Sequence, residues 1–127
     1  MINLNSDVKE FKDLIKALNP CQEGPDWIDL VEDGKPYKEI FKNVDKGFRE
    51  EWAFFVISHV GKYLTEQARL PFINLIQDSM YAFVIYLMQP YLTEQEDALL
   101  KSKFEEKLPT AEKELLTKKI ERLKKWR

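Results

Sequence analysis

Two stretches decide the fold: residues 51–64, EWAFFVISHVGKYL, and residues 71–91, PFINLIQDSMYAFVIYLMQPY. Ten of the sixteen aromatic residues lie between Phe48 and Tyr91. In both stretches the apolar residues recur every three or four positions, which is the period of a helix and not the alternation of a strand. Both stretches therefore predict long helices, and their wide apolar faces indicate contact with neighbours on more than one side.

The helical period continues on both sides of these stretches. We expect helices at about 7–18, 36–64, 71–89, 94–107 and 111–126, with a short turn at 27–31. Gly47 favours a break in the second of them, because glycine inside a helix costs about 1 kcal/mol relative to alanine. Thr93 and Glu96 have the spacing of a capping box, whereas residues 65–70 are expected to turn the chain before Pro71. The periodicity indicates no internal repeat.

These elements predict an all-α fold. We expect one domain over residues 1–127, a bundle of five to six helices in which residues 93–127 form a peripheral, charged C-terminal helical hairpin. A chain of 127 residues fits one domain, and its hydrophobic content of 44% can supply a core.

Charge and cysteine content bound the class of protein. The net charge is −2, but residues 1–34 hold eight acids against three lysines and residues 111–127 hold seven bases against three acids. The single cysteine, Cys21, excludes an internal disulfide and suits a reducing compartment. Polar residues interrupt the apolar run 70–92, so we expect a cytoplasmic protein without a membrane span.

A catalytic apparatus is hard to assemble from this sequence. It has no glycine-rich phosphate loop, no paired cysteines and no zinc-type histidine spacing, so we expect no enzyme, no metal and no cofactor. One possible exception is the pair of His59 and Asp78. If the two long helices are antiparallel and joined near residues 65–70, these side chains lie at the same height and could act as a base and the group that orients it. A small-ligand pocket lined by His59, Asn74, Asp78 and Tyr81 is therefore one alternative. The other is a core histidine and a solvent-facing polar strip.

Two surfaces are candidates for binding a partner. The second half of the helix expected at 71–89 is apolar all round and needs a cover, which favours Tyr81, Ile85, Met88 and Tyr91 as contact residues. Trp27, in an acid-rich loop, is a second anchor. The basic tail 118–127 could bind nucleic acid or an acidic membrane, or it could be the solvated end of a helix.

We therefore expect a non-enzymatic interaction domain. It would bind another protein and neutralise it, as inhibitors and immunity-type proteins do, and a homodimer is an open alternative. The second hypothesis is a small-ligand-binding domain or weak enzyme around His59 and Asp78. The third is a binder of nucleic acid or acidic membrane through residues 118–127.

Overall fold

The structure is a computed structural model that describes residues 1–18, 26–44 and 50–125, apart from the side chains of Asp26 and Trp27. Cys21 and Gly47 lie outside these residues, as does the expected break at Gly47. In chain order the helices are α1 (Val8–Leu18), α2 (Asp26–Asp29), the 3-10 helix η1 (Tyr37–Asn43), α3 (Glu50–His59), the 3-10 helix η2 (Gly61–Tyr63), α4 (Glu66–Leu75), α5 (Ser79–Met88), α6 (Glu94–Phe104) and α7 (Thr110–Lys125). The described residues form no strand, which confirms the all-α prediction.

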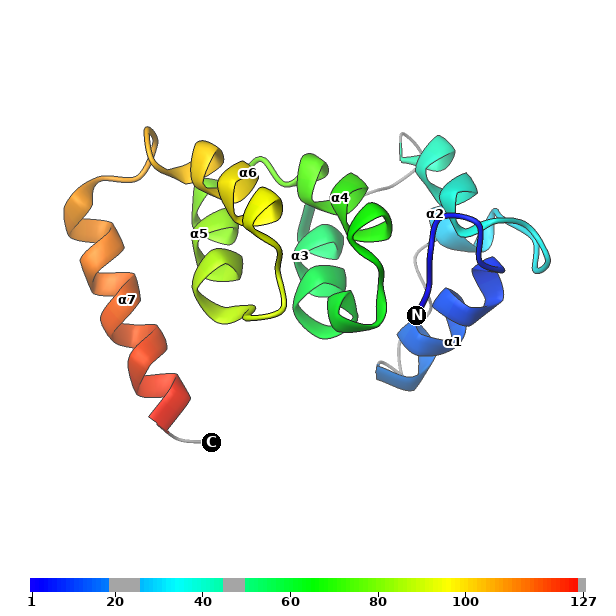
Figure 1. The fold of residues 1–127 in the computed structure, drawn as a ribbon, viewed down its shortest axis with the longest axis horizontal. Helices are drawn as coiled ribbons and strands as arrows, with labels where there is room; N and C mark the ends of the chain where they lie inside the picture. Colours follow the sequence, from blue (N-terminus) through cyan, green and yellow to red (C-terminus); the bar gives the residue numbers. More distant parts are fainter. Residues whose placement is uncertain (19–25, 45–49, 126–127) are drawn as a thin grey trace.

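Two helical hairpins form the middle of the molecule and lie side by side in Figure 1. Hairpin 1 consists of α3, η2 and α4 (residues 50–75), and hairpin 2 consists of α5 and α6 (residues 79–104). The first helices of the two hairpins, α3 and α5, pack against each other, and so do the second helices, α4 and α6. This is the stacking of helix pairs found in α-solenoids. The N-terminal elements and α7 lie at opposite ends of the stack (Figure 1).

The two hairpins are an internal repeat of 28 residues. Residues 63–67 and 91–95 have the same sequence, YLTEQ, and Phe55-Val56-Ile57 returns as Phe83-Val84-Ile85 at the same offset. The expectation of no internal repeat was therefore wrong. Sequence reasoning missed it because it interpreted the same motif in two ways, as a turn at its first occurrence and as a helix start at its second.

Burial follows the repeat through the second helices. Three buried positions in α4 and directly after it correspond to three buried positions of α6. They are Ala68, Phe72 and Ile76 in hairpin 1 and Glu96, Leu100 and Phe104 in hairpin 2. The three positions recur every four residues, which puts them on one side of each helix. The repeat therefore specifies the same buried stripe twice, with one polar exception at Glu96.

Helix α4 begins at the first YLTEQ motif and not at Pro71. Thr65 is its N-cap and accepts a hydrogen bond from the N–H of Ala68. Pro71 thus lies inside α4, although a proline in a helix removes one backbone donor. The helix expected at 71–89 is in fact two helices, which is why the described helices exceed five or six.

The break between α4 and α5 is built by two acids. Asp78 is the N-cap of α5 and accepts a hydrogen bond from Met80 N–H at 2.8 Å. The carboxylate of Glu50, at the start of α3, accepts hydrogen bonds from the N–H groups of Gln77 and Asp78. Both acids occupy backbone donors that the end of a helix would otherwise leave free. The start of α3 is thereby tied to the start of α5.

An aromatic cluster joins the N-terminal elements to hairpin 1. The rings of Phe11, Tyr37 and Phe41 surround Phe72 of α4, with centroid separations of 6.0, 6.4 and 4.9 Å to that ring. Tyr37 is completely buried, and its hydroxyl donates to the carbonyl of Ala68 at 2.8 Å. Burial raises the pKa of this hydroxyl well above 10.0. The N-terminal elements therefore fix α4 in place.

Helix α7 packs differently from the expectation of a charged C-terminal hairpin. The main partner of α6 is α5, and α7 also packs on α5. Lys113 joins α7 to the end of α6, since its ammonium donates to the carbonyl of Glu105 at 3.3 Å. Among the described helices, none is both long enough and apolar enough to span a membrane.

Candidate functional site

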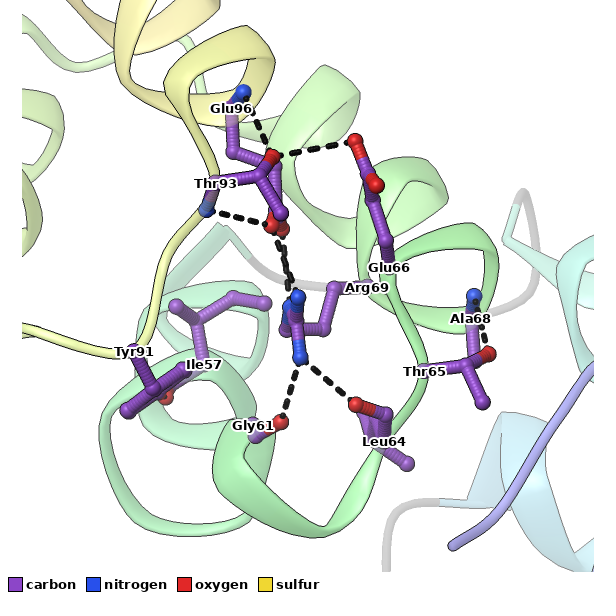
Figure 2. A network of polar contacts seen from close by, with 10 residues as sticks. All are labelled: Ile57, Gly61, Leu64, Thr65, Glu66, Ala68, Arg69, Tyr91, Thr93 and Glu96. Carbon is purple, nitrogen blue, oxygen red and sulfur yellow. Dashed lines mark hydrogen bonds and ion pairs between the residues drawn. The ribbon is translucent and has the colours of Figure 1, made fainter.

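A buried ion pair lies between the two hairpins (Figure 2). Arg69 of α4 donates from Nε and Nη2 to the two carboxylate oxygens of Glu96 in α6, at 2.8 and 2.7 Å. The Glu96 side chain is 0% exposed, and that of Arg69 is nearly as well buried. Two parallel hydrogen bonds of this kind are among the strongest polar contacts in proteins. The pair therefore joins hairpin 1 to hairpin 2.

The remaining groups of the pair also find partners. Nη1 of Arg69 donates to the carbonyls of Leu64 and Gly61, at 2.6 and 3.4 Å, in the loop of its own hairpin. Glu96 and Thr93 form a capping box, which confirms the start of α6 that the sequence predicts. The Thr93 hydroxyl donates to Glu66 at 3.0 Å. A network satisfied in this way is far less costly to bury than isolated polar groups.

Tyr91 closes the network on the side of hairpin 1 (Figure 2). Its ring lies 5.6 Å from the guanidinium carbon of Arg69, and its hydroxyl donates to the carbonyl of Ile57 in α3. The ring passes so close to Gly61 that a Cβ there would lie 3.2 Å from two ring carbons. Glycine is required at this position by the close approach of the tyrosine.

The electrostatics of the network keep both members of the ion pair charged. Burial raises the pKa of Glu96, but the hydrogen bond from Arg69 and those within the capping box, together with the positive charge, bring it below 4.5. The hydrogen bond to Glu96 raises the pKa of Arg69, and burial opposes it. Burial raises the pKa of Tyr91 to about 12. These groups do not change charge near neutral pH, so the network acts as a structural joint.

The structure does not bring His59 and Asp78 together. Asp78 lies beside Glu50 at the start of α3, because the Glu50 carboxylate binds its N–H. His59 is the last residue of α3, roughly 13 Å further along a helix that rises 1.5 Å per residue. The sequence argument placed them at one height by assuming a continuous helix from Pro71, and the break at Asp78 removes that assumption.

The other two residues of the expected pocket are also apart from His59. Asn74 is exposed on α4, and its carbonyl accepts a hydrogen bond from Lys103 at 3.4 Å. Tyr81 is half-buried on α5 and packs against Phe54, with ring centroids 4.7 Å apart. His59 is exposed and packs on Phe55 at 4.8 Å. Each of the four expected residues thus has different neighbours.

The residues expected to contact a partner divide into core and surface. Ile85 is completely buried, so it is a core residue and was wrongly expected to meet a partner. Tyr91 is half-buried in the network between the hairpins, and Tyr81 and Met88 keep part of their surface. The side chain of Trp27 lies outside the described residues. The apolar second half of the expected helix is covered by α3, α6 and α7, which all contact α5.

One surface was not anticipated, and the repeat is the signal that could have found it. Trp52, Phe55 and His59 follow one another along α3, with successive ring centroids 5.7 and 4.8 Å apart. Their counterparts 28 residues on are Met80, Phe83 and Leu87 of α5. We call these six positions the α3–α5 face. Phe83 is nearly covered by α6, while Met80 is 45% exposed and the others keep part of their surface.

A hollow of about 490 Å³ adjoins Phe83 at one edge of this face. Its walls come from α7, and they include Lys113, Thr117 and Glu121. In residues 1–18, 26–44 and 50–125, no three histidine, cysteine or acidic side chains gather in a group that could hold a metal ion. Comparison of the chain with protein-family models, curated proteins and solved structures gave no significant match.

Proposed function

We propose that this chain is a non-enzymatic module that binds a segment of another protein on the α3–α5 face. The observation that carries the proposal is the face itself, in which both first helices of the repeat place apolar or aromatic side chains on one side. In stacked helix pairs the equivalent helices form a continuous surface. Such a surface is suited to an elongated protein ligand.

The chemistry of the face supports a protein ligand. Trp is among the residues that carry most of the binding energy at interfaces, and Phe buries a large apolar area. Met adapts its shape to the surface that it meets. Met80 and His59 are exposed, and Trp52, Phe55 and Leu87 are half-buried, whereas Phe83 is nearly covered. A ligand would complete the burial of side chains that the fold covers only in part.

The small-ligand hypothesis has weaker support. The four residues of the expected pocket lie in separate surroundings, so we do not carry the small-ligand or weak-enzyme hypothesis further. The inhibitor or immunity-type role remains the specific form of our proposal. A small module of this kind would act by occupying the surface of its partner.

Site-specific crosslinking tests the proposal. A photoreactive phenylalanine analogue at Met80 is compared with the same analogue at Leu18 of α1, which is 47% exposed and therefore a matched control. After irradiation in cells that make the protein, we expect a crosslinked species at Met80 and not at Leu18. Trp52→Ala in the same chain should remove that species if the face is continuous.

Two results would count against this function. Equal crosslinking at the two positions would indicate contact without a preferred face. A Met80 product that survives Trp52→Ala would show that the two first helices do not act together. A product of twice the mass of the chain would make a second copy the partner, in keeping with the homodimer alternative.

A further inference from the structure

Helix α7 has the place of a first helix in the repeat. It follows α6 and contacts α5, as α5 follows α4 and contacts α3 (Figure 1). The first helices α3 and α5 each pack against the second helix of their own hairpin. In the part of the chain that the structure describes, no helix follows α7. Among the described residues, no second helix therefore packs on α7 as α4 packs on α3 and α6 on α5.

This side of α7 is apolar and basic at once. Leu115 and Leu123 are 56% and 60% exposed, more than any other leucine among the described residues. Together with the exposed Lys119 and Arg122 they stand at positions i, i+4, i+7 and i+8 of the helix. That spacing puts the four side chains on one face. We call them the outer face of α7.

The charge of α7 indicates which kind of neighbour fits it. Acids are favoured in the first turn of a helix, as with Glu66 in α4 and with Glu94, Glu96 and Asp97 in α6. In an antiparallel hairpin that turn lies beside the end of the first helix. The last turn of α7 carries Arg122, Lys124 and Lys125. A helix with an acidic first turn would meet opposite charge there.

From this we infer that the outer face of α7 binds an amphipathic helix of a partner protein, antiparallel to α7 and acidic in its first turn. The partner helix would cover Leu115 and Leu123 and place its acids near Lys119 and Arg122. This surface is distinct from the α3–α5 face, so the inference goes beyond the proposed function. A second copy of α7 is a poorer occupant, because antiparallel pairing about Lys119 would bring like charges together.

A peptide-binding experiment tests the inference. The probe is a fluorescein-labelled synthetic peptide with the sequence of residues 92–108, LTEQEDALLKSKFEEKL, which contains a second helix of the repeat with its cap. Its anisotropy is followed during titration with the full chain. Leu115→Ser/Leu123→Ser and Lys119→Glu/Arg122→Glu should each weaken binding by about tenfold or more, since each pair supplies one part of the contact.

Matched controls keep the result specific. Lys9→Glu/Lys16→Glu makes the same charge change on exposed lysines of α1, at the other end of the stack, and should leave binding unchanged. The four substituted residues of α7 are exposed, so circular dichroism should report unchanged folding. A peptide with its first-turn acids replaced by lysine should bind more weakly than the original.

Four outcomes would overturn the inference. The first is no binding of the peptide by the folded chain. The second is binding that the leucine variant leaves unchanged, which would indicate charge attraction alone. The third is tighter binding of phosphatidylserine vesicles than of the peptide, which would assign this face to a membrane surface. The fourth is tighter binding of a DNA duplex, with a steep dependence on salt.

Discussion

Hairpins 1 and 2 begin their second helices with the same residues and use them differently. Tyr63 of hairpin 1 is 44% exposed, whereas its counterpart Tyr91 is packed between Arg69 and Gly61. The difference comes from what precedes each hairpin. Hairpin 2 follows another hairpin, whereas the loop of hairpin 1 pairs with the N-terminal segment, through hydrogen bonds between Ile2 and residues 63 and 65. Position in the stack therefore decides the environment of a repeated residue.

The same lesson holds at the one position where the buried stripes differ in polarity. Ala68 of hairpin 1 corresponds to Glu96 of hairpin 2, and both are fully buried. The Glu96 carboxylate is tolerated because the preceding hairpin supplies Arg69. In hairpin 1, the backbone carbonyl of Ala68 instead accepts a hydrogen bond from the hydroxyl of Tyr37, which lies in the element before that hairpin. Each hairpin is thus matched to the element before it.

The largest expected effect comes from breaking the ion pair on one side. Arg69→Ala leaves Glu96 buried without its counter-charge and should lower the free energy of unfolding by about 3–5 kcal/mol. Urea denaturation measures the loss. Lys42→Ala, which removes the exposed partner of Glu39, is the control and should cost less than about 1 kcal/mol.

Arg69→Leu/Glu96→Ala sharpens this test, because it makes hairpin 2 resemble hairpin 1. Replacing both members of a buried pair by apolar groups is often close to neutral, so this variant should recover most of the stability that Arg69→Ala loses. A double variant as unstable as the single one would show that Glu96 is not the source of the cost.

A smaller effect is expected at the contact between Gly61 and Tyr91. Gly61→Ala places a methyl group against the tyrosine ring and should destabilise the protein by about 1–3 kcal/mol. Gln89→Ala is the matched control, since Gln89 is the counterpart of Gly61 in hairpin 2 and already carries a Cβ. Thermal unfolding of the two variants should differ clearly. Equal melting temperatures would contradict the close approach of the ring.

A still smaller difference in stability is expected between variants of the two N-cap threonines, Thr65 and Thr93. Thr65→Ala and Thr93→Ala each remove an N-cap, which costs roughly 1 kcal/mol. Thr93→Ala should cost more, because the same hydroxyl donates to Glu66. Thr117→Ala, inside α7, serves as the control and should stay near the wild type. Equal losses at the two caps would show that the contact with Glu66 contributes nothing measurable.

The smallest expected effect is a change in acid sensitivity. The pKa of Glu96 is lower in the folded protein than its ordinary value of 4.5, so its contribution to stability is present above that pH and is lost as pH falls below it. Glu96→Gln should therefore show a shallower fall of stability between about pH 5 and 3. Urea denaturation across this range measures the slope. The unsubstituted chain, measured in the same series, gives the reference slope.

Local patterns predicted several elements correctly. The apolar spacing predicted a helix at about 7–18, which is α1, and Thr93 with Glu96 predicted the start of α6. Both signals lie within one or two helical turns, where residues four apart face the same way. The prediction failed at Ile76–Asp78, because the break there depends on Glu50, which is distant in the sequence.

The candidate surfaces show the same limit. Three residues of the expected pocket, Asn74, Asp78 and Tyr81, were placed on one helical period, and that period does not continue through Asp78. The α3–α5 face can be recognised in the sequence only once the repeat is recognised. The repeat was missed because α4 was expected to begin at Pro71 and not at the first YLTEQ motif. The ion pair of Arg69 and Glu96 joins residues 27 positions apart, and no local pattern pairs them.

By itself the sequence determined that the chain is helical, where several helices begin and which sides of them are apolar, because these depend on neighbouring residues. The tertiary structure decided that two helix pairs stack, that Glu96 is buried against Arg69, and that Tyr91 is covered while Tyr63 is not. The physical reason is that burial and pairing depend on which elements meet in space. The same five residues therefore acquire different surroundings in the two hairpins.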